Sequence, residues 1–427
     1  MTAKRHSRLG VRYSFGAGAI VAALWVATIV APWQAVGAQD STAKPTVSPT
    51  ASPAEPPAGP KTNVYFQFGS RGYSIGGSKV TEQAANLTYE YRTKQWGLSV
   101  DGSSLKYGAL GRTISGTGNS NVRFDYMLQP GDSLMVYGRS GSKPGTLDSV
   151  QVEAIGVAGG SLVDLQANSL GNPSMFGGRA VFSYPVGDLV LNIRGALEVE
   201  NKPVATQEVY WRGTTWAIGS TLHGNVGKAQ LAAMVDISSS SSDSLGGKNL
   251  YPGGGETTFS LDLRLPIDNP SDSTGDDWDS AFSAWFSSPF GATRADQPNL
   301  LLPLGNSFGL SGALSFPVGG ATWGPSVQFQ STSASATAKS GATSLSTSAS
   351  GWAANFAINA DIPTGSIFEL TPEVGYAVGN TSTSYGETST KTVIVQRRGR
   401  TVTTTSGGTT ATSLRGWWIA LGVSAHF

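Results

Sequence analysis

Residues 416–427, GWWIALGVSAHF, form an alternating segment on which the printed chain ends. One face of this segment carries Trp417, Ile419, Leu421, Val423, Ala425 and Phe427, and the other carries Trp418, Ala420, Gly422, Ser424 and His426. A period of two residues is the pattern of a β-strand with two different faces. In a soluble protein, an apolar strand at the end of the chain is an aggregation hazard. The rest of the sequence therefore has to indicate what covers this face.

The same period of two recurs from Thr62 onward. In residues 121–129, for example, Val122, Phe124 and Tyr126 alternate with Arg123 and Asp125. Further alternating segments lie at 85–92, 187–200, 258–266 and 351–361. The chain is also rich in glycine (Gly 55) and poor in charge (13% Asp, Glu, Lys and Arg), which favours strands and turns over helices. We therefore expect an all-β fold.

Alternation alone does not say which face meets water. In a soluble sandwich the apolar face packs inward, whereas in a membrane barrel it faces lipid and the polar face lines the interior. The N-terminus, the turns and the tryptophan positions favour the barrel. Tryptophans near predicted strand ends, which suit the two membrane interfaces, are Trp96, Trp211, Trp216, Trp323 and Trp417.

The N-terminus has the layout of a secretory signal peptide over residues 1–38. Four bases (Lys4, Arg5, Arg8 and Arg12) precede an apolar stretch and the small residues of 36–38. An uncleaved membrane anchor is the alternative, because the apolar stretch approaches the length of a bilayer span. Cleavage removes four bases and no acid, so the formal net charge falls from +1 to −3. A mature chain so close to neutrality shows no electrostatic reason to bind nucleic acid.

Residues 39–61 are rich in Pro, Ser, Thr and Ala, which predicts a disordered periplasmic tether before the folded part, residues 62–427. Within the folded part, short turns with Pro and Gly at 128–132, 183–188, 315–320 and 361–366 alternate with long polar connections. Those long connections are predicted at 238–256, 331–350 and 380–408. Short turns on one rim and long loops on the other are typical of outer-membrane barrels.

The final segment resembles the C-termini of Gram-negative outer-membrane β-barrel proteins. These proteins end on a strand with a terminal Phe and apolar residues at alternate positions, which the barrel-assembly machinery reads. Here Trp417, Ile419, Leu421, Val423 and Phe427 match that pattern, while Ala425 is smaller than the usual residue. The resemblance implies Sec export to the outer membrane, with outer-membrane lipid, lipopolysaccharide, periplasmic chaperones and the assembly machinery as partners.

We therefore expect a transmembrane antiparallel up-and-down β-barrel of about 16 strands (range 14–18), with short periplasmic turns and long extracellular loops. Its last strand should pair with the first strand, near residues 63–70, so that no edge remains. The count is 16 if residues 142–174 form one outer loop, and 18 if 148–156 and 161–168 are membrane strands. Residues 268–306 should carry one strand and a long loop.

Residues with enzymatic chemistry are sparse. The sequence has no Cys, and of its three His, His6 leaves with the signal peptide while His223 and His426 fall at the predicted periplasmic rim. No His, Asp and Glu cluster has the spacing of metal ligands. We predict no enzyme activity, no cofactor and no metal.

The polar face of the strands is where function is expected. The candidate lumen-lining residues are Arg123, Asp125, Arg139, Glu153, Arg179, Arg194, Glu198, Arg212, Asp236, Asp262, Arg264, Glu369 and Glu373. Both signs are about equally represented among them, which predicts weak ion selectivity. A barrel of about 16 strands is too wide to fill with side chains, so we expect a porin-like channel for small solutes.

Two alternatives to the porin-like channel stay open. One is a channel for hydrophobic compounds that is plugged by residues 142–174 or 268–306. The other is a non-conducting surface or scaffold barrel, in which the charges of the polar face satisfy one another.

Cleavage after Ala38 is directly testable. N-terminal sequencing of the membrane-extracted protein should begin at Gln39, because the small residues before it fit a signal-peptidase site. A sequence that begins at Met1 would instead establish an uncleaved anchor.

Overall fold

The computed structural model describes residues 60–75, 78–109, 112–140, 174–200, 210–211, 214–241, 243–245, 248–251, 254–267, 278–290, 306–340, 343–395 and 398–427. The predicted signal peptide and tether therefore lie outside the described residues, apart from the last residues of the tether. Within the described part, no helix is both long and apolar enough to cross a bilayer.

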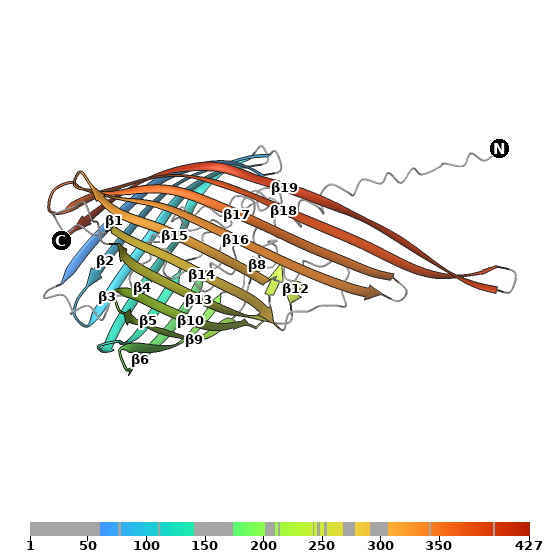
Figure 1. Cartoon of the computed structure of the whole chain (residues 1–427), viewed down its shortest axis with the longest axis horizontal. Coiled ribbons are helices and arrows are strands. Elements are labelled where there is room, and N and C mark those ends of the chain that lie inside the picture. The colour runs from blue at the N-terminus through green and yellow to red at the C-terminus, as the bar shows by residue number, and fades with distance from the viewer. Residues whose placement is uncertain are drawn as a thin grey trace, which may run out of the picture.

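Sixteen antiparallel strands close into one barrel, as predicted from the sequence (Figure 1). Each strand pairs with its neighbours along the chain, in an up-and-down order. The first eight are β1 (Lys61–Ile75), β2 (Ser78–Arg92), β3 (Trp96–Ala109), β4 (Arg112–Gln129), β5 (Asp132–Arg139), β6 (Met175–Val186), β7 (Leu189–Glu200) and β9 (Thr214–Val226). The other eight are β10 (Ala229–Ser240), β13 (Gly254–Ile267), β14 (Trp278–Phe290), β15 (Asn306–Val318), β16 (Ala321–Ser340), β17 (Thr343–Pro363), β18 (Phe368–Val395) and β19 (Arg398–His426).

The barrel closes where the last strand meets the first. β19 pairs antiparallel with β1 from Asn63↔His426 to Ile75↔Leu414. Beyond the strand, the backbone amides of Thr62 and Phe427 each donate to the other residue's carbonyl oxygen, at 3.0 and 2.8 Å. The predicted pairing of the final segment with residues 63–70 is therefore confirmed. Closure satisfies backbone groups that would otherwise be exposed at two sheet edges.

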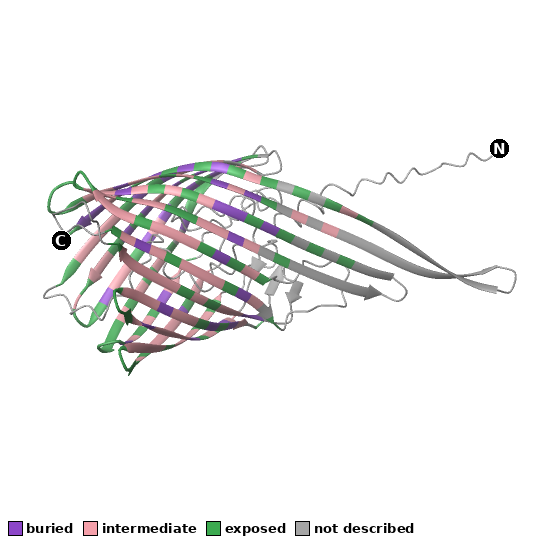
Figure 2. Ribbon diagram, viewed as in Figure 1, coloured by how far each residue is buried: buried purple, intermediate pink, exposed green. Residues whose placement is uncertain are grey.

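The apolar face of each strand points away from the barrel interior. On β2, Leu87 is 53% exposed, whereas its neighbours Asn86 and Thr88 are 5% and 4% exposed. On β4, Phe124 is 43% exposed, and exposed apolar residues recur on the other barrel strands. Exposed and less exposed positions alternate along the strands of the wall (Figure 2). Large exposed apolar residues in a closed sheet match a surface solvated by lipid. The barrel interpretation of the alternation is confirmed, and the soluble sandwich is excluded.

Short turns join strands at the rim that also holds both ends of the barrel chain. β4 passes to β5 through Pro130 and Gly131, and β6 passes to β7 through Gly187 and Asp188. Gly131 has φ 92° and Gly187 has φ 64°, in the left-handed region that glycine adopts without strain. The Pro and Gly turn signals of the sequence therefore identified this rim correctly.

Two predicted loops are strands instead. Residues 331–340 continue β16 and 343–350 begin β17, while residues 380–395 and 398–408 lie in β18 and β19. Runs of Ser and Thr are typical of loops, but β-branched Thr also favours strands, and each of these segments has a long antiparallel partner. Pairing of β15 with β16 ends at Ser333, and pairing of β1 with β19 ends at Leu414.

Beyond these limits, β16 to β19 project from the barrel as a four-stranded ribbon that narrows to the β18–β19 hairpin (Figure 1). We call this part the strand extension. It comprises residues 334–340 of β16, residues 398–413 of β19 and the parts of β17 and β18 that lie between them.

Other sequence-based expectations have mixed outcomes. One strand, β14, lies within 268–306, as predicted. Trp211 lies outside the barrel strands, in β8 (Tyr210–Trp211), which joins β11 (Asp243–Leu245) and β12 (Lys248–Tyr251) in a separate three-stranded sheet. Its place at a membrane interface stays a prediction. The possible strands at 148–156 and 161–168 lie outside the described residues.

The assignment of faces can be tested on β4. Phe124→Arg should destabilise the barrel by at most about 2–4 kcal/mol, because it places a charge on the lipid-facing side, and snorkelling toward the interface near Trp96 lowers this cost. Asp125→Arg, one residue away on the inner face, is the matched control, and it should leave the barrel folded. Heat-modifiable migration on a gel reports the folded fraction. The opposite ranking of the two variants would mean that the faces are inverted.

Candidate functional site

The inner face of the barrel carries the charged side chains. Of the thirteen predicted lumen-lining residues, Glu153 and Arg212 lie outside the described residues. The others are buried or half-buried, at positions that alternate with outward-facing residues: Arg123, Asp125, Arg139, Arg179, Arg194, Glu198, Asp236, Asp262, Arg264, Glu369 and Glu373. They are distributed over β4, β5, β6, β7, β10, β13 and β18. They therefore form a band around the wall, and no single cluster unites them.

Sequence analysis missed further charged residues of this face. They are Arg71, Glu82, Glu90, Asp101, Asp132, Glu200, Glu256, Asp279 and Asp361, all buried or half-buried in barrel strands. Most continue an alternation that was already recognised: Glu90, for example, lies between Tyr89 and Tyr91 in a predicted strand. Glu90, Glu200 and Asp361 lie on the polar side of recognised segments, and following the strands beyond those segments would have found Arg71, Glu82 and Glu256. The expected balance of signs is wrong for the described residues, because acids clearly outnumber bases.

Five arginines of the inner face each form an ion pair with a carboxylate. The pairs are Arg71–Glu82, Arg123–Asp125, Arg139–Glu200, Arg194–Asp236 and Arg264–Asp279. The nitrogen–oxygen distance is 2.9 Å for Arg123–Asp125 and 3.0 Å for Arg139–Glu200. Charge-assisted pairs of this kind fix the position of long side chains.

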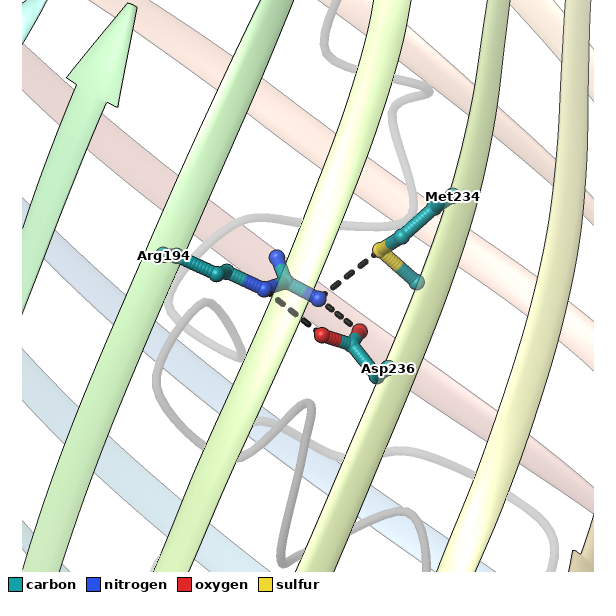
Figure 3. A network of polar contacts seen from close by, with 3 residues as sticks. All are labelled: Arg194, Met234 and Asp236. Carbon is teal, nitrogen blue, oxygen red and sulfur yellow. Dashed lines mark hydrogen bonds and ion pairs between the residues drawn. The ribbon is translucent and has the colours of Figure 1, made fainter.

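The pair Arg194–Asp236 bridges two strands that are not neighbours. Arg194 on β7 and Asp236 on β10 both stand opposite Gly219 of the intervening strand β9. Arg194 Nε donates to Asp236 Oδ1 at 2.8 Å, and a terminal guanidinium nitrogen of Arg194 lies 2.9 Å from the sulfur of Met234 (Figure 3). A Cβ on Gly219 would lie 1.7 Å from Asp236 Oδ1. Glycine therefore leaves the space in which the ion pair lies.

The same arrangement recurs on β5, β6 and β7. Tyr137 and Glu198 both stand opposite Gly177, and the Tyr137 hydroxyl donates to Glu198 Oε1 at 2.8 Å. A Cβ on Gly177 would lie 2.5 Å from the Tyr137 ring. These contacts across three strands, each above a central glycine, brace the wall from within.

Several carboxylates of the inner face accept hydrogen bonds from uncharged groups. Trp418 Nε1 donates to Glu373 Oε1 at 2.8 Å, and Asn121 Nδ2 donates to Asp101 Oδ2 at 2.9 Å. The backbone amide of Ser183 donates to Asp132 Oδ1 at 2.8 Å. The carboxylates of Glu198 and Glu256 accept from the hydroxyls of Tyr137 and Ser287. Neutral donors stabilise a carboxylate without cancelling its charge.

One part of the inner face is almost inaccessible. Arg71 and Glu82 face each other on β1 and β2 and are 6% and 1% exposed, and Tyr107, opposite Glu82 on β3, is 2% exposed. A buried ion pair repays its desolvation only when its geometry and hydrogen bonding are good, so it is weak evidence of added stability.

The two histidines outside the signal peptide contact amides. Asn192 Nδ2 lies 3.1 Å from His223 Nε2, and His426 Nδ1 lies 3.0 Å from Asn63 Oδ1. Both lie at the short-turn rim, as predicted. Among the described residues, no group of three His, Asp or Glu is placed to hold a metal ion. The interpretation that the protein is not an enzyme stays a prediction.

The predicted assembly signal lies on the outer face of β19. Trp417, Ile419, Leu421 and Phe427 are exposed, and Val423 is half-buried. Ala425 has the same parity but is only 8% exposed, between Val64 and Phe368 on the neighbouring strands. Its short side chain does not reach past these larger neighbours. Whether the assembly machinery reads this segment stays a prediction.

Comparisons with known proteins give a likeness of fold only. No protein-family model matches the chain, and no curated protein matches it. Similar solved structures include Pseudomonas aeruginosa OccK5 (OpdH), with 10% identity and a TM-score of 0.43 over 86% of this chain and 98% of that one. OmpT of Vibrio cholerae has 9% identity and a TM-score of 0.39 (86% and 98%), and Pseudomonas aeruginosa OprD has 12% and 0.36 (85% and 95%). The chain thus resembles outer-membrane barrels in architecture.

The contact above Gly219 can be tested by adding one methyl group. Gly219→Ala should destabilise the barrel by about 1–3 kcal/mol, because the new Cβ displaces the ion pair between Arg194 and Asp236. Gly195→Ala is the matched control, since a Cβ there meets nothing within 4 Å, and its effect should stay within about 0.5 kcal/mol. Guanidinium unfolding followed by tryptophan fluorescence measures both. Equal effects would show that the space above Gly219 is not required.

Proposed function

We propose that the protein is a porin-like channel through which small solutes diffuse passively across the outer membrane of a Gram-negative bacterium. The observation that carries this proposal is the closed barrel of sixteen strands with a charged inner face. Barrels of eight strands are filled by their own side chains, whereas 16–18-stranded porins leave an aqueous channel. Charged side chains on the inner face are stabilised by water, which such a channel would contain.

The orientation in the membrane follows from the two rims. Both ends of the barrel chain and the short turns lie at one rim, which we assign to the periplasm. The opposite rim and the strand extension then face the cell exterior, where lipopolysaccharide is the surrounding lipid. Sec export, periplasmic chaperones and the barrel-assembly machinery, with Trp417 to Phe427 as its signal, belong to the same proposal.

A non-conducting surface barrel is the second candidate, and the strand extension favours it. β18 and β19 are paired with each other over their whole lengths, well beyond the last residue pair that joins β19 to β1. A channel needs no such projection, whereas a surface protein that contacts other molecules would use one. The plug of the third candidate, a channel for hydrophobic compounds, was assigned to 142–174 and 268–306, which lie largely outside the described residues.

Conductance in a planar bilayer separates these candidates. The purified, heat-modifiable protein should produce stepwise current increases in potassium chloride, because a water-filled barrel passes small ions without a gating partner. Addition of the same detergent without protein serves as the control. Folded protein that inserts but stays electrically silent would contradict the channel and support the surface barrel.

A further inference from the structure

The charged residues of the inner face are predominantly acidic. The barrel strands hold fourteen buried or half-buried acids: Glu82, Glu90, Asp101, Asp125, Asp132, Glu198, Glu200, Asp236, Glu256, Asp262, Asp279, Asp361, Glu369 and Glu373. They hold six buried or half-buried bases: Arg71, Arg123, Arg139, Arg179, Arg194 and Arg264. Two exposed bases, Lys61 and Arg92, also lie at inner-facing positions, so the described inner face carries six more negative than positive formal charges. From this excess we infer that the channel selects for cations and for cationic small solutes, an inference that rests on the proposed channel function.

Ion pairing does not remove this excess. The five ion pairs join five arginines to five acids, so they contribute no net charge. Five of the other acids accept hydrogen bonds from neutral donors, as Glu373 does from Trp418 and Glu198 from Tyr137. Because these donors are neutral, they leave the formal charge of each carboxylate uncancelled. The inner face thus keeps its negative charges while it satisfies their hydrogen-bonding capacity.

Part of the acidic excess lies on strands that carry no buried or half-buried base among the described residues. Along the six consecutive strands β14 to β19, the buried or half-buried charged residues are Asp279, Asp361, Glu369 and Glu373, with no base among those described. Asn359 pairs with Glu373 and Pro363 pairs with Glu369 across β17 and β18, so Asp361 lies near both carboxylates on the inner face. The arginines lie on β1, β4, β5, β6, β7 and β13. We call these four carboxylates on β14 to β19 the acidic arc. A cation in the channel would meet negative charge on this part of the inner wall.

This arrangement works through the field it creates and requires no single binding site. A passage lined by one sign of charge within a low-dielectric wall concentrates ions of the opposite sign. Rings of Asp and Glu are a common source of cation selectivity in pores. Because the field acts through water, its range shrinks from about 10 Å at 0.1 M salt to about 3 Å at 1 M. Selectivity that arises in this way must weaken as salt is added.

The test is the reversal potential of the full-length barrel under a potassium chloride gradient. At about 0.1 M salt the permeability ratio of potassium to chloride should exceed roughly threefold, and it should decline toward unity at about 1 M. Swelling of liposomes that contain the protein should likewise be faster in arginine than in glutamate, two solutes of similar size and opposite charge.

Neutral substitutions identify the residues responsible. The triple variant Asp361→Asn, Glu369→Gln and Glu373→Gln preserves side-chain shape and the acceptor for Trp418, and it should lower the permeability ratio at least about twofold. Lys106→Gln is the control, because Lys106 is exposed on the outer face of β3 and its charge should not affect selectivity. Heat-modifiable migration verifies that both variants fold.

The possible outcomes distinguish a failure of cation selectivity from a failure of the proposed channel function. A barrel that conducts but prefers chloride, or is unselective at low salt, overturns cation selectivity while the channel function stands. A triple variant with unchanged selectivity overturns the role of the acidic arc. A folded barrel without conductance contradicts the channel itself.

Discussion

The pairing of β1 with β19 is the constraint on which the rest of the structure depends. A sheet in a bilayer has no water to satisfy the backbone groups at its edges, and each unsatisfied group costs several kcal/mol. The thirteen residue pairs from Asn63↔His426 to Ile75↔Leu414 remove both edges at once. Since the two partners lie at opposite ends of the folded part, the barrel cannot close until the whole chain is present.

Closure also fixes where side chains find room. In a closed barrel the inner face curves toward its own axis, so long side chains on neighbouring strands converge. Gly177 and Gly219 relieve this crowding because they lack a Cβ. Each lies between two polar residues of the neighbouring strands, whose side chains meet above its Cα. Part of the unusual glycine content therefore serves the inner wall, in addition to the turns at which Gly131 and Gly187 adopt positive φ.

Much of the fold was predictable from the sequence. Each strand of a barrel has one face toward lipid and one toward the interior, so apolar and polar residues alternate along it. The strand around Phe124, the turns with Pro and Gly, and the closure at Phe427 followed from that rule. The rule ends where the wall leaves the bilayer, so the Ser- and Thr-rich ends of β16 to β19 were mistaken for loops. The separate sheet that contains Trp211 was not predicted either, because its strands of two to four residues are too short to show an alternating pattern.

The candidate site was predicted less completely. Alternation identified the inner face, but charges such as Asp101 and Asp132 fell outside the recognised segments, and Asp361, at the end of a recognised segment, was not included among the lumen-lining candidates. The pairing of Arg194 with Asp236 was not accessible either, since it requires the register of three strands around Gly219. The register between neighbouring strands depends on the whole barrel and cannot be predicted from the sequence of a single strand. The balance of charge on the inner face is therefore a structural property more than a sequence motif.

The strand extension has a consequence for encounters at the cell surface. From Leu414 to Arg398, β19 rises beyond its last contact with β1, and at about 3.4 Å per residue this length spans several tens of ångströms even when the strand is tilted. A phage, an antibody or a neighbouring cell that approaches from outside would touch the hairpin tip before it reached the membrane. In the proposed orientation, the strand extension therefore screens the side of the barrel from which it projects.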